Sequence, residues 1–557
     1  MSSVKRIYVL GSVVAGLLLL ALVLQAGLQY YLKPRIGYLL QKIIVTGSDS
    51  LYRFDQGAFS VDIWNGGVSL DSCRLSVDST RYARLKAEDA LPALTVSMRL
   101  ARIKISGLGI WKWLYSKKAD CRTLTLAGAD VTLYRHPVSI KTGEAPAGKE
   151  LYPLIQSTVR SIRIGEVQLG SVSISYDNGD SAKPFRWAFE RCDVRLRDIL
   201  VDSSTEKDST RIAYALGLTV AVKQVSLLTS KGLYHLGLGA LSYDFGKRIA
   251  VLDALSLHPV LDAPDFYRKV KFQQDRYTLD IPEMRLFGLN ISELLLFNRL
   301  RVDSADLKHA EIHITHDRMY PPSGRSNLGK YPNQLLLKAP LDILARRIRV
   351  EDGRLTYGEK SGSTLQWGIL TFGHVHGLLT QVTNDPAAIA ENPWWKADLY
   401  ADFLGSSPLH ALFAFYLGSP SGKFTVEASL KDLDADRLNP VTAALAGASF
   451  QSFQLTQLSC LLSGDERQAS GSLHMQYRNL KMELGKPFVS FVVNKLALHP
   501  DNPSGKKPER VAAGIIQVRD PTKSFFNLIW KTMFGGMRTI VLRDIGKSRF
   551  SKSSHGK

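Results

Sequence analysis

Five histidines lie close together in two short stretches of the chain, where they could bind a metal ion. His309, His313 and His316 occupy one stretch, and His374 and His376 occupy the other. Zinc sites use histidines at such short spacings. On a strand, however, His309 and His313 would share one face and His316 would take the other. No carboxylate or cysteine recurs beside both stretches, so we interpret these residues as surface histidines or histidines with protein partners.

The other motifs of catalysis are missing from the sequence. It contains no GxSxG elbow, no phosphate-binding P-loop and no HExxH zinc motif. Gly237-Leu238-Gly239 begins like a dinucleotide fingerprint, but Ser242 stands where the third glycine belongs and a strand pattern follows. We therefore expect no enzyme activity and no cofactor. An envelope enzyme acting on glycans or lipids would need converging carboxylates or a Ser/His pair, and no such pair can be assigned.

Four cysteines lie far apart, without a CxxC pair: Cys73, Cys121, Cys192 and Cys460. This spacing disfavours a zinc site. We interpret them as buried small apolar side chains. The spacing does not decide whether they form disulfides in an oxidising compartment.

The chain is strongly basic, with a net charge of +20 and a pI near 9.6 over 557 residues. Such a charge favours anionic partners, of which nucleic acid and membrane surfaces are the commonest. Charge is the only feature that favours nucleic acid. Because an apolar segment at the N-terminus also explains a basic chain, we expect an anionic membrane surface and no nucleic acid.

Residues 7–32 contain no charged side chain and are rich in Leu, Val, Ala and Gly. About 20 apolar residues span a bilayer, so the segment predicts a transmembrane anchor after a cytoplasmic stub at residues 1–6. A cleaved signal peptide is the alternative, but the small residues of a cleavage site are missing around Ala26. Basic residues flank the segment on both sides, so charge does not set its orientation.

Alternation of apolar and polar residues dominates the chain from about Ile43 to His499 and predicts strands with one apolar face. Gly, Pro, Asn and Asp punctuate these strands, which predicts a mainly antiparallel sheet with short connections. Helical patterns are few, at Leu151–Val159, Leu335–Ala345 and Leu438–Ala446. The apolar face could then be closed in a β-sandwich, or it could form the trough of a curled open sheet that holds lipid tails.

Two stretches of similar order suggest an internal duplication. Glu311–Tyr357 reads as a strand, a loop with Asp317-Arg318 and two prolines, a helical patch at Leu341–Ala345, and a strand pair. Val131–Tyr176 repeats that order more loosely. We expect the protein to be built by extension of one β unit.

The C-terminal segment 521–557 predicts a basic amphipathic helix followed by a basic tail. Its apolar residues recur at helical spacing, and the candidate membrane-contacting side chains are Phe525, Ile529, Trp530, Met533, Lys531 and Arg538. Such a helix can lie on an anionic membrane surface. Equally, it could cap the end of the sheet with its apolar face.

With these residues in view, the chain resembles the AsmA-like family of bacterial envelope proteins. The resemblance rests on the strand-rich entry Leu51–Val77 behind the anchor, on the module Ile312–Tyr357, and on Leu433–Lys481, which is similar to the family's C-terminal module. It implies residues 43–300 as an N-terminal β-groove region and 301–510 as central and C-terminal β modules.

The same resemblance implies a relation to chorein-type lipid-transfer proteins with repeating β-grooves. It implies an inner-membrane anchor, a chain mostly in the periplasm, and phospholipid transport toward the outer membrane. Alternation supplies the candidate groove-lining residues, which are Val172, Ile174, Tyr176, Leu216, Leu218 and Phe403. The alternative function is an envelope scaffold or assembly factor, made of β-sandwich modules, that binds protein partners and transports no lipid.

Overall fold

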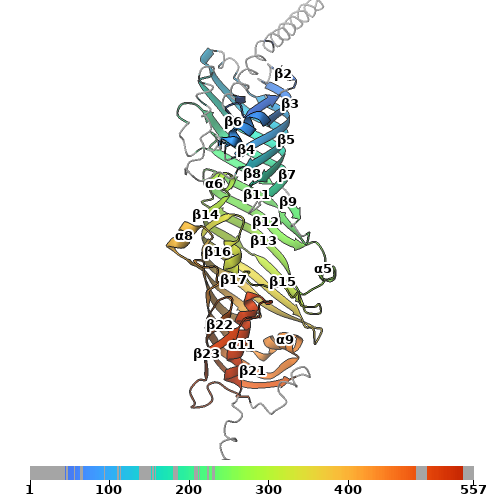
Figure 1. The fold of residues 1–557 in the computed structure, drawn as a ribbon, viewed down its shortest axis with the longest axis vertical. Helices are drawn as coiled ribbons and strands as arrows, with labels where there is room; N and C mark the ends of the chain where they lie inside the picture. Colours follow the sequence, from blue (N-terminus) through green and yellow to red (C-terminus); the bar gives the residue numbers. More distant parts are fainter. Residues whose placement is uncertain are drawn as a thin grey trace, which may run out of the picture. The chain divides into compact units, whose positions relative to one another are not determined.

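A computed structural model describes most of the chain as long strands with a few short helices (Figure 1). It describes Tyr30 and residues 44–45, 48–55, 57–62, 67–88, 90–92, 94–109, 112, 115–136, 152, 156, 159–179, 186–205, 211, 214–222, 225–228, 232–484 and 498–542. The predicted mainly β class, with large curled sheets and few helices, is confirmed.

None of the helices in these described ranges is long and apolar enough to cross a membrane. The predicted anchor at residues 7–32 lies outside the described ranges except for Tyr30. The predicted helix at Leu151–Val159 lies largely outside them as well.

Contacts divide the chain into two compact units. The first contains residues 1–225, 240–250 and 290–298, and the second contains residues 226–239, 251–289 and 299–557.

The first unit is built on an 8-stranded sheet in the order β1-β3-β4-β5-β6-β7-β8, with β2 paired to β3. Its strands are β1 (Tyr52–Asp55), β2 (Phe59–Asp62), β3 (Gly67–Val77), β4 (Leu94–Ser106), β5 (Lys118–Arg135), β6 (Ser161–Asp177), β7 (Arg186–Val201) and β8 (Gly217–Val222). The unit also holds α2 (Ser79–Ala87), β11 (Ala240–Asp244) and α6 (Ile291–Phe297).

The second unit is built on a larger sheet in the order β23-β22-β21-β20-β19-β18-β17-β16-β14-β13-β12-β10-β9, with β15 paired to β13 and β16. Its strands are β9 (Val225–Leu228), β10 (Tyr234–Leu238), β12 (Ile249–Pro259), β13 (Asp275–Phe287), β14 (Arg299–Lys308), β15 (Glu311–Asp317), β16 (Asp342–Lys360), β17 (Trp367–Thr383), β18 (Trp394–Phe403), β19 (Ser407–Tyr416), β20 (Phe424–Asp434), β21 (Ala448–Gly464), β22 (Gln468–Leu484) and β23 (Val511–Val518). Its helices are α5 (Ala263–Val270), α7 (Pro332–Leu337), α8 (Pro386–Glu391), α9 (Ala435–Ala446) and α11 (Phe525–Val541).

Both sheets are mixed rather than purely antiparallel. β5 and β6 pair in parallel in the first sheet, and β14 and β15 pair in parallel with β16 in the second. A parallel pair needs a crossover connection. Residues 318–341 connect β15 to β16, and the connection between β5 and β6 lies largely outside the described residues. These two crossovers fall in the two stretches that we predicted to be duplicated, so each stretch holds one strand–crossover–strand unit.

The predicted strand pairs inside these stretches are wrong. Ser161–Asp177 and Asp342–Lys360 are each a single long strand. The predicted helix at Leu335–Ala345 is also wrong beyond Leu337, because Asp342 already begins β16 and Ala345 pairs with Val302 of β14. Tertiary strand pairing overrides the local helical pattern there. The predicted helix at Leu438–Ala446 is confirmed as α9.

β-Bulges explain why one long strand resembled two short ones. His309 lies between β14 and β15, Asp352 lies in β16, and His374 lies in β17. These neighbouring positions are irregular, with φ values of 52°, 50° and 48°. Register shifts between β16 and β17 fall around Gly353. Each bulge adds one residue, which reverses the side to which the following side chains point. The apolar positions in the sequence change phase at the same place, so the apolar side chains stay on one face along the whole strand.

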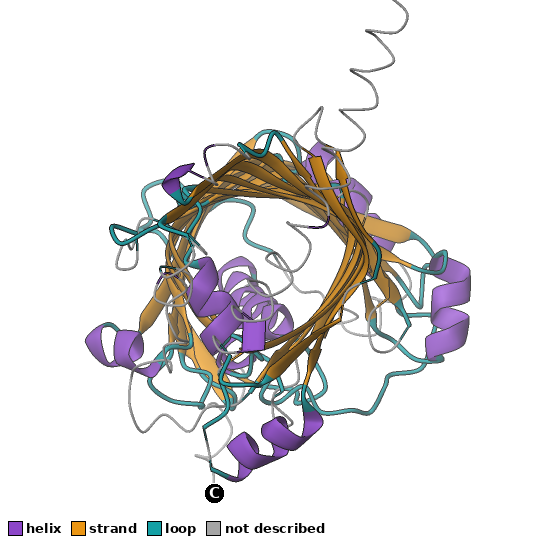
Figure 2. Ribbon diagram, turned by 90° about the horizontal axis from the view of Figure 1, so that it is seen from above, coloured by secondary structure: helices purple, strands orange, loops and turns teal. Residues whose placement is uncertain are grey.

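The strands drawn in Figure 2 are strongly curved. Bulges increase the local twist and bend of a strand. The long strands therefore curl, as predicted for the sheet, instead of lying flat.

Candidate functional site

The second sheet has one apolar face, which we define by the buried residues on which α11 packs. Phe424, Val426, Leu462 and Leu473 lie on neighbouring strands of this face and are no more than 2% exposed. Directly paired residues on adjacent strands form rows across the face. One row contains Ala397, Phe413, Val426 and Leu462.

Helix α11 covers the part of the apolar face over β22 and β23. It begins after Ser524, whose hydroxyl accepts a hydrogen bond from the Asn527 amide at 3.3 Å. A Cβ atom on Gly536 would lie 3.1 Å from Leu473 Cβ. Glycine at this position therefore lets the helix approach the sheet closely.

The apolar face continues over β13–β18, beyond the strands that α11 covers. One row there contains Leu279, Ile312, Leu355, Phe372 and Phe403. Ile312 is 36% exposed, whereas Leu462 is fully buried on the same face. The described strands of the second unit belong to a single sheet, so this unit contains no second sheet of its own among the described residues to pack on this part.

A second row lies one step along the same strands and contains Tyr277, Ile314, Tyr357 and Leu370. Tyr277 is 40% exposed. Burial and the neighbouring Glu359 carboxylate raise the pKa of the Tyr357 hydroxyl, so it stays protonated at neutral pH.

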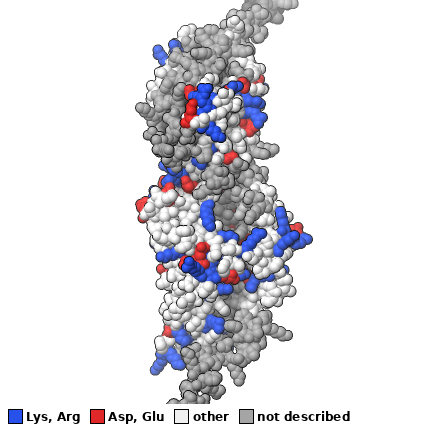
Figure 3. Space-filling model, in the orientation of Figure 1, with Lys and Arg blue, Asp and Glu red and all other residues white. Residues whose placement is uncertain are grey.

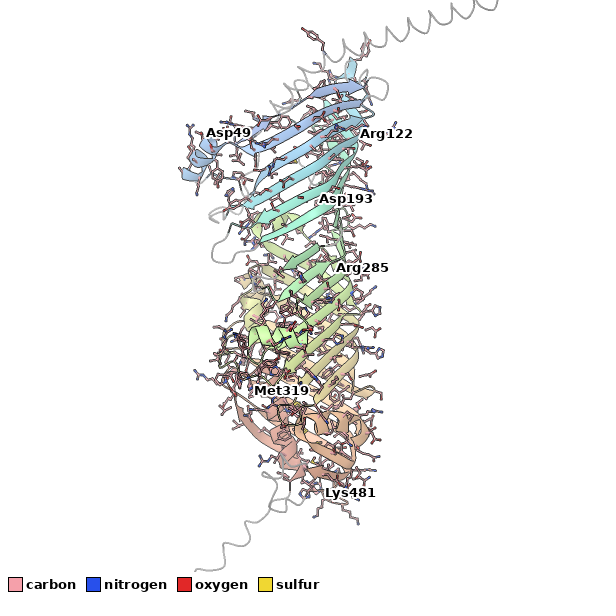
Figure 4. The ribbon with its side chains drawn as sticks, turned by 90° about the vertical axis from the view of Figure 1, so that its right-hand side faces the viewer. Asp49, Arg122, Asp193, Arg285, Met319 and Lys481 are labelled. Atoms are coloured by element: carbon pink, nitrogen blue, oxygen red, sulfur yellow. The ribbon has the colours of Figure 1, made fainter. Side chains whose placement is uncertain are left out.

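The opposite face of the same strands is polar. Thr278, His313, Thr356 and Thr371 form one of its rows. Arg285, which is labelled in Figure 4, belongs to another row of this face, with Asp306 and Arg349. The alternation that the sequence predicted is therefore present, and it separates an apolar face from a charged one.

The histidines of the two sequence clusters have polar or aromatic partners. Nδ1 of His309 and Nδ1 of His374 lie 3.1 Å and 2.7 Å from the two carboxylate oxygens of Asp352. His316 contacts Asp275 at 2.8 Å, and His376 stacks on Tyr400. No group of metal-binding side chains forms a site among the described residues. The described structure thus gives His309, His316, His374 and His376 protein partners.

Four of the six candidate groove residues lie on the apolar face of the first sheet. Ile174 pairs with Val131, and Tyr176 pairs with Leu133. Leu218 pairs with Leu196 in a row that runs from Val68 through Ile105, Leu124 and Val167. Val172 and Tyr176 are almost completely buried, so in this structure they are core residues.

The remaining two candidates differ in position. Leu216 lies one residue before β8 and is 40% exposed. Phe403 belongs to the second unit, where its ring centroid lies 5.2 Å from that of Phe372. The structure thus places the candidates on two different sheets.

The candidate membrane helix is amphipathic, but its apolar side divides into two parts. Phe525 and Ile529 are buried against the sheet, and Met533 packs beside them. This packing is the sheet-capping role that the sequence left open. Trp530, Lys531 and Arg538 are exposed, and they lie on the part of the helix that does not face the core.

The four cysteines, for which the sequence left disulfides open, are free thiols in this structure. Cys73, Cys192 and Cys460 are buried, and Cys121 is half-buried. Burial raises the pKa of Cys121, Cys192 and Cys460 to about 11. These thiols are therefore neutral and poorly nucleophilic at neutral pH.

Basic and acidic side chains are intermingled on the surface drawn in Figure 3. Salt bridges between the two kinds of side chain are common on the strands, as in Arg102–Asp71 and Arg99–Asp130. The described part of this face therefore carries mixed charge.

The fold and these two faces define a curled, mixed β-sheet protein with a partly uncovered apolar face. No protein-family model matches the chain, and no curated protein is significantly similar to it.

Proposed function

We propose that the apolar face of the second sheet binds the acyl chains of phospholipids. The observation that carries this proposal is the continuation of the face from buried core into partly exposed rows. Ile312 and Tyr277 keep more than a third of their surface exposed, although Ile312 pairs with Leu279 and Leu355 and Tyr277 pairs with Ile314. Lipid chains would cover this surface and remove it from water.

The function needs no catalysis. Each methylene group of an acyl chain contributes about 0.8 kcal/mol when it leaves water. Rows of similar apolar side chains on successive strands give a chain many positions of nearly equal energy. A lipid can then move along the face without returning to water.

In this proposal the protein takes part in phospholipid transport or homeostasis between the inner and outer membranes of a bacterial envelope. Residues 7–32 anchor it in the inner membrane, and the bulk of the chain lies in the periplasm. Support comes from the apolar anchor sequence, the basic charge and the resemblance to the AsmA-like family. In this proposal the exposed residues Trp530, Lys531 and Arg538 of α11 contact an anionic membrane surface.

The test compares substitutions of neighbouring residues on opposite faces. The double variant Ile312→Asp with Leu355→Asp places two carboxylates on the apolar face. The matched control, His313→Asp with Thr356→Asp, places two carboxylates on the polar face of the same strands.

Lipid bound to the full-length protein, purified in mild detergent, is measured by native mass spectrometry. We expect phospholipid on the wild type and the control, and at least ten-fold less on the apolar-face variant. Equal lipid occupancy of the two variants would reject the apolar face as the binding site. A folded wild type without lipid would favour the envelope scaffold instead, and protein partners should then be sought by crosslinking.

A further inference from the structure

The apolar rows of the second sheet end in a polar row at one end of β13, β15 and β16. Asp275, His316 and Glu359 are directly paired on these three strands. They lie two residues beyond Tyr277, Ile314 and Tyr357 on the same face. The face therefore changes from apolar, through tyrosine, to charged within three successive rows.

This polar row is organised by hydrogen bonds. Asp275 contacts His316 Nδ1 at 2.8 Å and accepts a hydrogen bond from the Tyr277 hydroxyl at 3.1 Å. Glu359 accepts hydrogen bonds from the Tyr357 hydroxyl at 2.9 Å and from Arg318 at 3.0 Å. The two tyrosine hydroxyls thus orient the two carboxylates.

The polar row remains accessible. The side chains of Asp275 and Glu359 are 32% and 19% exposed, and that of Arg318 is 52% exposed. The two carboxylates outnumber the one guanidinium, so the row favours binding of a cationic group. Arg318 at the border of the row can bind an anionic group. A carboxylate oxygen can accept more than one hydrogen bond, so these groups can bind a ligand without losing their present partners.

The order of the rows matches the order of groups in an amphiphile. Tyrosine is favoured where an apolar region meets a polar one, because its ring is apolar and its hydroxyl is polar. A primary ammonium group donates three hydrogen bonds and is attracted by carboxylates and by aromatic rings. We propose that this row binds the headgroup of a zwitterionic aminophospholipid, with the ammonium at Asp275 and Glu359 and the phosphate at Arg318.

This inference rests on the proposed function, since it takes the same apolar face as the site of the acyl chains. It adds a headgroup preference. A phospholipid with an ethanolamine headgroup should be bound in preference to one with glycerol, which has no cation, or choline, whose quaternary ammonium has no N–H donor.

The sheet offers a closely matched control. Asp280 lies on the same strand as Asp275 but on the polar face, where its carboxylate contacts Nε2 of His258 at 2.7 Å. Asp275→Asn with Glu359→Gln removes both carboxylate charges of the polar row and keeps the side-chain shapes. Asp280→Asn removes a similar His–Asp contact that faces away from the proposed site.

The experiment is competition binding of equimolar ethanolamine, glycerol and choline phospholipids with identical acyl chains to the full-length protein, read by native mass spectrometry. We expect the wild type and Asp280→Asn to retain the ethanolamine lipid about ten-fold over the others. The double variant should lose that preference and keep the same total lipid occupancy and melting temperature. Arg318→Gln should weaken binding of the ethanolamine lipid and not reverse the order.

The outcomes separate the two proposals. Lipid binding without a headgroup preference in the wild type, or a preference that survives in the double variant, would overturn the headgroup site alone. A wild type that retains no lipid would overturn the proposed function and the headgroup site together. If the double variant unfolds, Tyr277→Phe with Tyr357→Phe, which removes only the hydroxyls that orient the carboxylates, should reduce the preference.

Discussion

Replacing Phe525 by alanine should release α11 from the sheet. The Phe525 side chain is only 4% exposed. Its ring centroid lies 4.9 Å from that of Phe424 and 5.0 Å from that of Tyr331. Truncating a buried phenylalanine to alanine costs about 3–5 kcal/mol, and the loss here falls on the first turn of the helix.

Hydrogen exchange read by mass spectrometry measures this effect on the full-length protein. Each 1.4 kcal/mol lost from local stability raises the exchange rate of the protected amides about ten-fold. Peptides covering 525–541 should therefore exchange on the order of 10²–10³ faster in Phe525→Ala than in the wild type. Peptides from the first sheet should exchange at unchanged rates.

The next residue in the chain is the control. Phe526 is 62% exposed, and its nearest aromatic neighbour outside the helix, Phe413, lies 6.4 Å away between ring centroids. Phe526→Ala should cost less than about 1 kcal/mol. If both variants accelerate exchange of α11 equally, then the docking of the helix through Phe525 is wrong.

Two further predictions concern backbone contact and pH. Gly377→Ala should destabilise the second unit by about 2 kcal/mol or more, because a Cβ there would collide with the carbonyl oxygen of Asp398. Gly373→Ala on the same strand should not destabilise it, because the atom nearest to the new Cβ would be 3.9 Å away. Urea denaturation of both variants checks this, and equal midpoints would contradict it. Burial raises the pKa of Cys192 and Cys460 from 9.0 to about 11, so the thiols ionise more readily in the unfolded chain. The free energy of unfolding should then be unaffected by them below pH 9 and fall as the pH rises from 9 to 11. Cys460→Ala should weaken that pH dependence, and both thiols should react with maleimide at pH 8 only after unfolding.

Local patterns predicted those parts of the fold that depend on neighbouring residues. Leu438–Ala446 has helical spacing, and α9 forms there with Asp434 as its N-cap. One-sided alternation predicted the apolar faces, because side chains on a strand point alternately to the two sides. The mainly β class and the curl of the sheets follow from the same signal.

Long-range pairing was not predictable in the same way. Ile343–Ala345 joined a helical pattern in the sequence, yet it pairs in parallel with β14, which lies some 40 residues earlier in the chain. Ile312 was not among the candidate lining residues, because its exposure depends on which helices pack on the neighbouring strands, and α9 contacts β16 and β17 whereas α11 contacts β22 and β23. The polar row was not predictable either. Asp275 and Glu359 both pair with His316 only because of the register of β15 with its two neighbouring strands.

The bulges have a consequence for how these strands can change. On β16, even-numbered residues up to Val350 face the apolar side, and odd-numbered residues do so from Leu355 onward. The change occurs at Asp352. Removing a single residue there would turn Leu355 and Tyr357 to the charged side and bring Arg354 and Thr356 inward. The composition of the strand would barely change, yet the face would no longer be apolar along half of the strand. Length, more than side-chain type, is therefore the property that this sheet must conserve at its bulges.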